Sequence, residues 1–186
     1  MRVLMIVATF ALGVTALAAA QTPAPAANPN ELKVGDQAPD FSLQAGDGKT
    51  YKLSDFKGKQ AVVVAWFPKA YTSGCTIECK SLAEHGDLIK KYNVAYFMAS
   101  VDPVADNKGF GEMHKADFPL LSDPTKETAT AYGVLSSPTG VARRWTFYVG
   151  KDGKIQAIDK KINVATSAED MAAKLGELNV EPRKNP

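Results

Sequence analysis

Two seven-residue segments, 61–67 (AVVVAWF) and 95–101 (AYFMASV), constrain the fold most strongly because they consist almost entirely of apolar residues. A strand with one face in solvent alternates apolar and polar residues, whereas a continuous apolar run is typical of a strand covered on both faces. The segments after these strands have helical character. We expect helices over about 74–92, 104–115, 126–132 and 167–178. The sequence therefore predicts a central sheet covered by helices on both sides.

Two Asp-Gly pairs, Asp47-Gly48 and Asp152-Gly153, each lie between short strand-like segments. This dipeptide favours the two-residue turn of a β-hairpin. The second hairpin is followed by the last predicted helix, for which Ser167 is the expected N-cap. Hairpins at both ends of a strand–helix–strand order predict a three-layer α/β fold with a central mixed sheet flanked by helices.

The first twenty residues carry a single charge, Arg2, and end in three alanines before Gln21. A basic start, an apolar centre and small residues before a cleavage point are typical of a secretory signal peptide. An uncleaved anchor is the alternative, because eighteen uncharged residues nearly span a bilayer. Gly13 and Thr15 inside the segment favour cleavage. We therefore expect residues 1–20 to be removed and the protein to be periplasmic or secreted, with no stable membrane association.

The rest of the chain predicts one domain. Residues 21–31 are rich in proline and alanine and are expected to form a linker, 32–180 have the length of one folded domain, and 181–186 form a C-terminal tail. The chain has 22 Lys and Arg against 20 Asp and Glu, a net charge of +2, and no cluster of basic residues. It therefore lacks the electrostatic pattern of a nucleic-acid-binding protein.

The only two cysteines, Cys75 and Cys79, lie within five residues of each other and cannot cross-link distant parts of a domain. Pro68 ends the preceding strand, and a Thr/Ser/Gly turn leads into a helix with Cys75 in its first turn. The unpaired N–H groups and positive dipole end of a helix favour an anionic sulfur there. Cys75 is therefore the candidate nucleophile, and Cys79 lies one turn later on the same face.

The pattern Pro68-x-x-x-Thr72-x-x-Cys75 resembles the active-site signature of the peroxiredoxins. Further segments resemble the peroxiredoxin Q group, also called bacterioferritin comigratory protein, in the same order along about 32–178. These segments are 34–43, 118–123, 131–134, 144–147 and 153–155. The resemblance implies a thioredoxin-like fold and a thiol-dependent peroxidase that reduces hydrogen peroxide and organic hydroperoxides without a metal or organic cofactor.

Carried over by position, Cys75 is similar to the peroxidatic cysteine and Thr72 to the residue whose hydroxyl binds the thiolate and the peroxide. Pro68 is similar to the proline that shields the sulfur, and Arg144 to the arginine that completes the pocket. Attack on an O–O bond needs a thiolate, a donor that orients the peroxide, and positive charge near the leaving oxygen. The neighbour Arg143 is expected to point to the opposite face of its strand.

The resemblance makes Cys79 the resolving cysteine, but the commonest spacing in the group is five residues, and Lys80 occupies that place here. Residues four apart in a helix are separated by about 6 Å along its axis, more than the roughly 3.8 Å between Cβ atoms that a disulfide prefers. The first turns of the helix would have to unwind. Alternatively, Cys79 is a core residue and the enzyme depends on an external thiol. Glu78 is expected to face solvent or the helix dipole and is given no role.

Two other classes remain open from the cysteines alone. A Sco-like copper-binding protein also carries Cys-x-x-x-Cys and two thiolates suit Cu(I), but it uses a late histidine, and none follows His114 here. A dithiol oxidoreductase acting on protein disulfides has two residues between its cysteines, not three. The resemblance implies a hydroperoxide substrate, a thiol or thioredoxin-like reductant protein, and a monomer.

Overall fold

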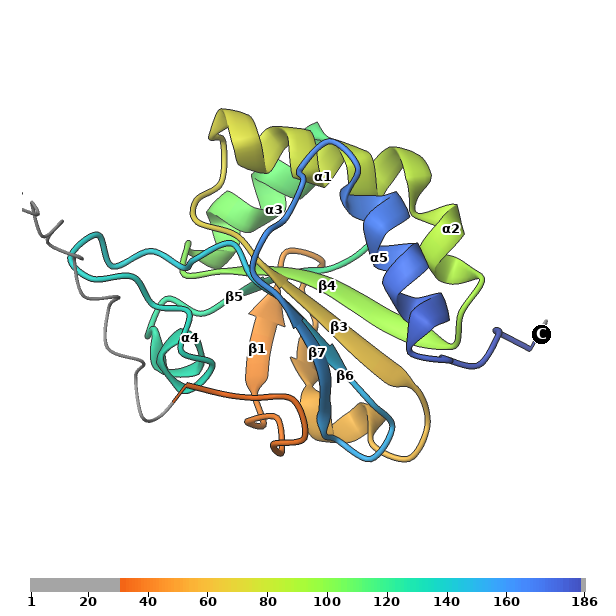
Figure 1. The fold of residues 1–186 in the computed structure, drawn as a ribbon. Helices are drawn as coiled ribbons and strands as arrows, with labels where there is room; N and C mark the ends of the chain where they lie inside the picture. Colours follow the sequence, from red (N-terminus) through yellow and green to blue (C-terminus); the bar gives the residue numbers. More distant parts are fainter. Residues whose placement is uncertain (1–30, 185–186) are drawn as a thin grey trace, which may run out of the picture.

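The computed structural model describes residues 31–184 as one α/β domain (Figure 1). The signal peptide expected over 1–20, nearly all of the expected linker and the last two residues of the tail lie outside the described residues. Within 31–184, no helix is both long and apolar enough to cross a membrane.

Seven strands form one sheet in the order β2-β1-β5-β4-β3-β6-β7. Their bounds are Ser42–Ala45 (β1), Thr50–Lys52 (β2), Ala61–Trp66 (β3), Val94–Ser100 (β4), Leu120–Ser122 (β5), Thr146–Val149 (β6) and Ile155–Asp159 (β7). The two apolar segments are the neighbouring central strands β3 and β4, which run parallel, as do β4 and β5. The remaining pairs are antiparallel. The sheet is therefore mixed, as the sequence predicts.

Helices cover both faces of the sheet (Figure 1). Their bounds are Ser73–His85 (α1), Asp87–Lys90 (α2), Val104–Met113 (α3), Glu127–Ala131 (α4) and Ser167–Glu177 (α5), with a 3-10 turn at Leu53–Phe56. Side chains of β3 alternate between the two layers: Val63 and Ala65 join the core under α1, α3 and α5, whereas Val62, Val64 and Trp66 join the core with α4. Period-two alternation thus explains why this strand is apolar throughout.

The long helix expected over about 74–92 is divided into α1 and α2 at Gly86. A Cβ atom at Gly86 would lie 2.6 Å from the Tyr96 hydroxyl oxygen and 2.5 Å from the Leu82 carbonyl oxygen. The break therefore coincides with a point where β4 approaches the helix too closely for a side chain. At α5, the N-cap is Thr166 rather than the expected Ser167, which is the first helical residue and is buried.

Candidate active site

Cys75 lies in the first turn of α1, directly after the loop that follows β3. Thr72 has extended backbone angles and occupies the N-cap position, so the helix starts where the sequence indicates. The Cys75 side chain has no exposed surface. Its sulfur is thus buried at the helix end where N–H groups and dipole favour negative charge.

Arg144 reaches Cys75 from the segment that precedes β6. Strand β6 runs antiparallel to β3, with Thr146 opposite Ala65, so its start lies beside the end of β3 where α1 begins. Arg144 Nη2 donates a hydrogen bond to Cys75 Sγ at 3.1 Å. Such a bond from a guanidinium favours the anionic sulfur. Arg143 instead lies exposed, 5.5 Å from the Trp145 ring centroid. Both arginines precede β6, which begins at Thr146, so strand alternation does not apply to them.

The Arg144 guanidinium lies against the first turn of α1. A Cβ atom at Gly74 would lie 3.4 Å from Arg144 Nη2, an ordinary van der Waals contact. The Arg144 side chain is 20% exposed. Arg144 is therefore largely shielded from water while it contacts Cys75, which strengthens its electrostatic effect.

Glu78 is the site residue that the sequence reasoning missed. Its side chain is fully buried, and its Oε2 forms an ion pair with Arg144 Nη1. Burial raises the pKa of Glu78 to about 7, against the opposing effect of the Arg144 guanidinium. Glu78 Oε1 has no hydrogen-bond partner within the described part of the chain.

A signal for Glu78 existed in the spacing. Residues three apart share a helix face, so Glu78 had to lie beside Cys75 on the face that also carries Cys79 and Leu82. A carboxylate on an otherwise buried stripe needs a cationic partner. The expectation that Glu78 faces solvent was wrong because only the apolar residues of this helix face were considered.

Thr72 and Pro68 lie in the same loop, but the structure does not bring the Thr72 hydroxyl onto the sulfur. Thr72 Oγ1 donates to the Lys69 carbonyl at 2.9 Å, and the residue is exposed. The side chain does not cap α1 either. Pro68 is half-buried at the start of the loop.

Cys79 lies one turn beyond Cys75 in the apolar core between α1 and the sheet. It has no exposed surface, and both cysteines are free thiols. Burial raises the pKa of Cys79 to about 12, with further contributions from the charges of Glu78 and Cys75. In this conformation Cys79 is a protonated core residue.

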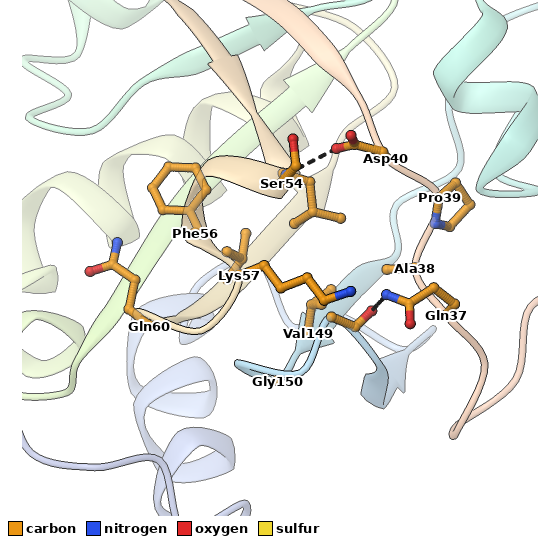
Figure 2. A pocket seen from close by; sticks show the side chains of 13 residues that line it. Gln37, Ala38, Pro39, Asp40, Ser54, Phe56, Lys57, Gln60, Val149 and Gly150 are labelled. Carbon is orange, nitrogen blue, oxygen red and sulfur yellow. Dashed lines mark hydrogen bonds between the residues drawn. The ribbon is translucent and has the colours of Figure 1, made fainter.

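A cavity of about 520 Å³ lies elsewhere in the molecule (Figure 2). Val62 and Val149, which pair at the start of β3, form part of its wall, together with residues 37–40 and the 3-10 turn. Cys75 follows the opposite end of β3, and none of the predicted site residues lines this cavity. Within residues 31–184, no three His, Cys, Asp or Glu side chains are grouped so that they could hold a metal ion.

Comparison with known proteins gives a consistent result. The model of the AhpC/TSA family matches residues 34–158. Peroxiredoxin Bcp of Escherichia coli is 36% identical over 135 residues, which cover 69% of this chain and 86% of that protein. Alkyl hydroperoxide reductase E of Mycobacterium tuberculosis is 33% identical over 132 residues, which cover 70% of this chain and 86% of that protein.

Solved structures show the same architecture. Peroxidoxin BcpB from Mycobacterium tuberculosis superposes with a TM-score of 0.72 at 28% identity, covering 79% of this chain and 98% of that chain. A structure of the Xanthomonas campestris bacterioferritin comigratory protein superposes with a TM-score of 0.69 at 24% identity, covering 78% and 96% of the two chains. The mixed seven-stranded sheet with its helices is therefore the thioredoxin-like fold expected from the sequence.

Proposed function

The chain belongs to the AhpC/TSA family and is a peroxiredoxin, a thiol peroxidase, and from this premise we propose that Cys75 attacks the hydroperoxide and Cys79 then resolves the oxidised sulfur. The observation that carries the first role is the hydrogen bond from Arg144 Nη2 to Cys75 Sγ. No comparable contact supports an anionic sulfur at Cys79, whose pKa is raised to about 12.

In the first step the Cys75 thiolate attacks one oxygen of the hydroperoxide. An S–O bond forms, the O–O bond breaks, and the second oxygen leaves as water or an alcohol after taking up a proton. Arg144 supplies fixed positive charge where negative charge develops on the leaving oxygen. Glu78, through its ion pair, holds the guanidinium in this orientation.

In the second step the Cys79 thiol condenses with the Cys75 sulfenic acid. The S–S bond forms, the S–O bond breaks and water leaves. Since the two residues are one helical turn apart and Cys79 is buried, the first turns of α1 must unwind before the sulfurs can meet. Ser81 Oγ accepts a hydrogen bond from the Ala168 N–H at 3.2 Å, so α5 holds α1 beyond this point.

A thiol or thioredoxin-like protein then reduces the disulfide and completes the cycle. We also propose that the enzyme is exported and works as a monomer outside the cytoplasm, supported by the signal-peptide pattern of residues 1–20 and by the resemblance to the peroxiredoxin Q group. N-terminal sequencing of the exported protein tests the cleavage before Gln21. Size-exclusion chromatography with light scattering tests the monomer.

The peroxidatic role is tested by mixing reduced protein with hydrogen peroxide in a stopped-flow instrument. We expect rapid thiol loss that Cys75→Ser abolishes, because no other described sulfur contacts a cation. Thiols that react no faster than free cysteine would remove Cys75 from this role.

The resolving role is tested on the product by mass spectrometry. The wild-type protein should lose two hydrogens per chain as the disulfide forms, whereas Cys79→Ser should accumulate sulfenic or sulfinic Cys75. An identical oxidised product in both proteins would show that an external thiol resolves Cys75.

A further inference from the structure

The active-site loop contacts a second buried carboxylate, Asp102, on the side away from Arg144. The Ala70 N–H donates to Asp102 Oδ2 at 2.8 Å, and both residues are buried. Asp102 follows the end of β4, next to the end of β3 from which the loop emerges. The carboxylate therefore bridges two loops at the edge of the sheet where Cys75 lies.

The Asp102 carboxylate bonds the buried Ser100 side chain, which belongs to a polar network with Asn107 and Ser122. Ser100 Oγ donates to Asp102 Oδ2 at 3.0 Å, and Asn107 Nδ2 lies 3.0 Å from Ser100 Oγ and 2.8 Å from Ser122 Oγ. Ser100, Asn107 and Ser122 are at most 3% exposed. A satisfied buried network of this kind is rigid. It connects the loop to β4, α3 and β5, and the carboxylate is fixed in place.

Tyr71, the residue after Ala70, shows that contacts with α3 help to determine the backbone conformation of the loop. Tyr71 has a φ of +63°, in the left-handed region that a bulky residue rarely adopts. Its hydroxyl donates to the Asp106 carbonyl at 3.2 Å, and its ring packs edge-on against Phe110. A Cβ atom at Gly109 would lie 2.6 Å from the Tyr71 hydroxyl oxygen. Such backbone strain persists only where the surroundings determine the conformation.

We propose that Asp102 is a positioning residue of the peroxidase. By accepting the Ala70 N–H it sets the path of residues 68–72, and this path determines where the first turn of α1 presents Cys75 to Arg144. Asp102 does not touch the reacting atoms. Its effect follows from the sensitivity of an oriented attack to small displacements of the attacking group.

The test compares peroxide reactivity with general thiol reactivity in the reduced full-length chain. Asp102→Ala should lower the second-order rate constant for hydrogen peroxide roughly 10- to 100-fold. The rate constant of Asp102→Asn should lie between those of Asp102→Ala and the wild type, because the amide oxygen still accepts the Ala70 N–H. Alkylation of Cys75 by iodoacetamide needs the thiolate but no oriented peroxide, so its rate should fall less than the peroxide rate.

Asp123 provides the matched control. It is 1% exposed, and its Oδ2 accepts the Ala129 N–H at 2.7 Å, but this bond lies at α4, which packs on the other face of the sheet. Asp123→Ala therefore removes the same kind of bond without touching the active-site loop, and Asp123→Asn keeps an amide oxygen that still accepts the Ala129 N–H. They should lower the stability and leave the peroxide rate unchanged.

An equal fall of the peroxide rate in the Asp102→Ala and Asp123→Ala variants would overturn the proposal, because the loss would then be structural. A folded Asp102→Ala variant with the wild-type rate would also overturn it. Where Asp102→Ala does not fold, equal rates in the two Asn variants overturn it instead. The inference rests on the proposed role of Cys75. If that role is wrong, the wild-type protein itself reacts no faster than free cysteine, and this result distinguishes the two failures.

Discussion

Cys75 and Cys79 lie one turn apart on the same helix and neither has any exposed surface, yet their surroundings are opposite. Cys75 Sγ accepts a hydrogen bond from a guanidinium at 3.1 Å. Cys79 is enclosed by apolar side chains, and its pKa is raised to about 12. The two buried sulfurs therefore differ in whether a cationic donor contacts them.

Glu78 precedes Cys79 in the chain and takes part in both surroundings. Its ion pair holds the Arg144 guanidinium that bonds Cys75, and its charge raises the pKa of Cys79. The helix end adds to the same difference, since only the first turn has unpaired N–H groups. One short segment thus places a cationic donor at the first sulfur and raises the pKa of the second thiol.

Removing the Arg144 guanidinium should have the largest effect, because it removes the feature that distinguishes Cys75 from Cys79. Arg144→Leu is expected to lower the rate of hydrogen peroxide reduction about 100- to 1000-fold, because the thiolate loses its donor and the leaving oxygen its charge partner. Single-turnover stopped-flow kinetics measures this loss.

Arg143→Leu is the matched control, since Arg143 is the adjacent residue and stacks on Trp145 away from the sulfur. It should leave the rate within about twofold of the wild type, as expected for a surface substitution. Similar losses in both variants would show that the contact between Arg144 and Cys75 does not determine the reactivity.

Replacing Glu78 with glutamine should have an intermediate effect, which appears in the pH dependence of the free energy of unfolding. Burial raises the folded-state pKa from 4.5 to about 7, so between these values the folded chain keeps a proton that the unfolded chain has lost. The associated stability is therefore present below about pH 4.5 and is lost as the pH rises through about 7. Relative to Glu78→Gln, the free energy of unfolding of the wild type should fall by about 3 kcal/mol across this interval.

Urea unfolding of both proteins between pH 4.5 and 7 measures the difference. The two histidines and the exposed carboxylates are common to both chains, so their titration cancels in the comparison. Parallel stability curves would mean that Glu78 titrates near its ordinary value and that the guanidinium outweighs burial.

The smallest effect concerns Cys79 in the first step. Cys79→Ser should leave the rate of the first peroxide turnover within about twofold of the wild type, because Arg144 bonds Cys75 and Cys79 lies in the apolar core. In the native reduced protein, iodoacetamide should label Cys75 and spare Cys79 until the chain is unfolded. Labelling of both thiols at similar rates would contradict the difference in their surroundings.

Much of the fold was predictable because its signals are local. The apolar runs 61–67 and 95–101 became β3 and β4, with boundaries within one residue. The Asp-Gly pairs lie in the turns between β1 and β2 and between β6 and β7. The division of the first long helix at Gly86 was not predicted. The close approach of the Tyr96 hydroxyl to this glycine comes from β4, which follows the helix in the sequence.

The site was predictable where its residues follow a local sequence pattern, and less so where they depend on loop conformation. Cys75 and its place in the first turn follow from the local Pro68-to-Cys75 pattern, and the structure brings Arg144 to it. The Thr72 hydroxyl bonds Lys69 instead of the sulfur, which depends on loop torsions that residue types do not specify. Asp102 was missed because its partner is a backbone N–H in a different loop.

The hydrogen bond by which Ser81 holds the start of α5 has a consequence for the partner that restores the enzyme. If only the chain before Ser81 rearranges on oxidation, the reduced and oxidised proteins differ in one short stretch of surface while the sheet and the other helices keep their shape. A reductase that recognises this stretch in its unwound form would bind the oxidised enzyme and not the reduced enzyme. The change in the helix would then be enough for the reductase to distinguish the two forms.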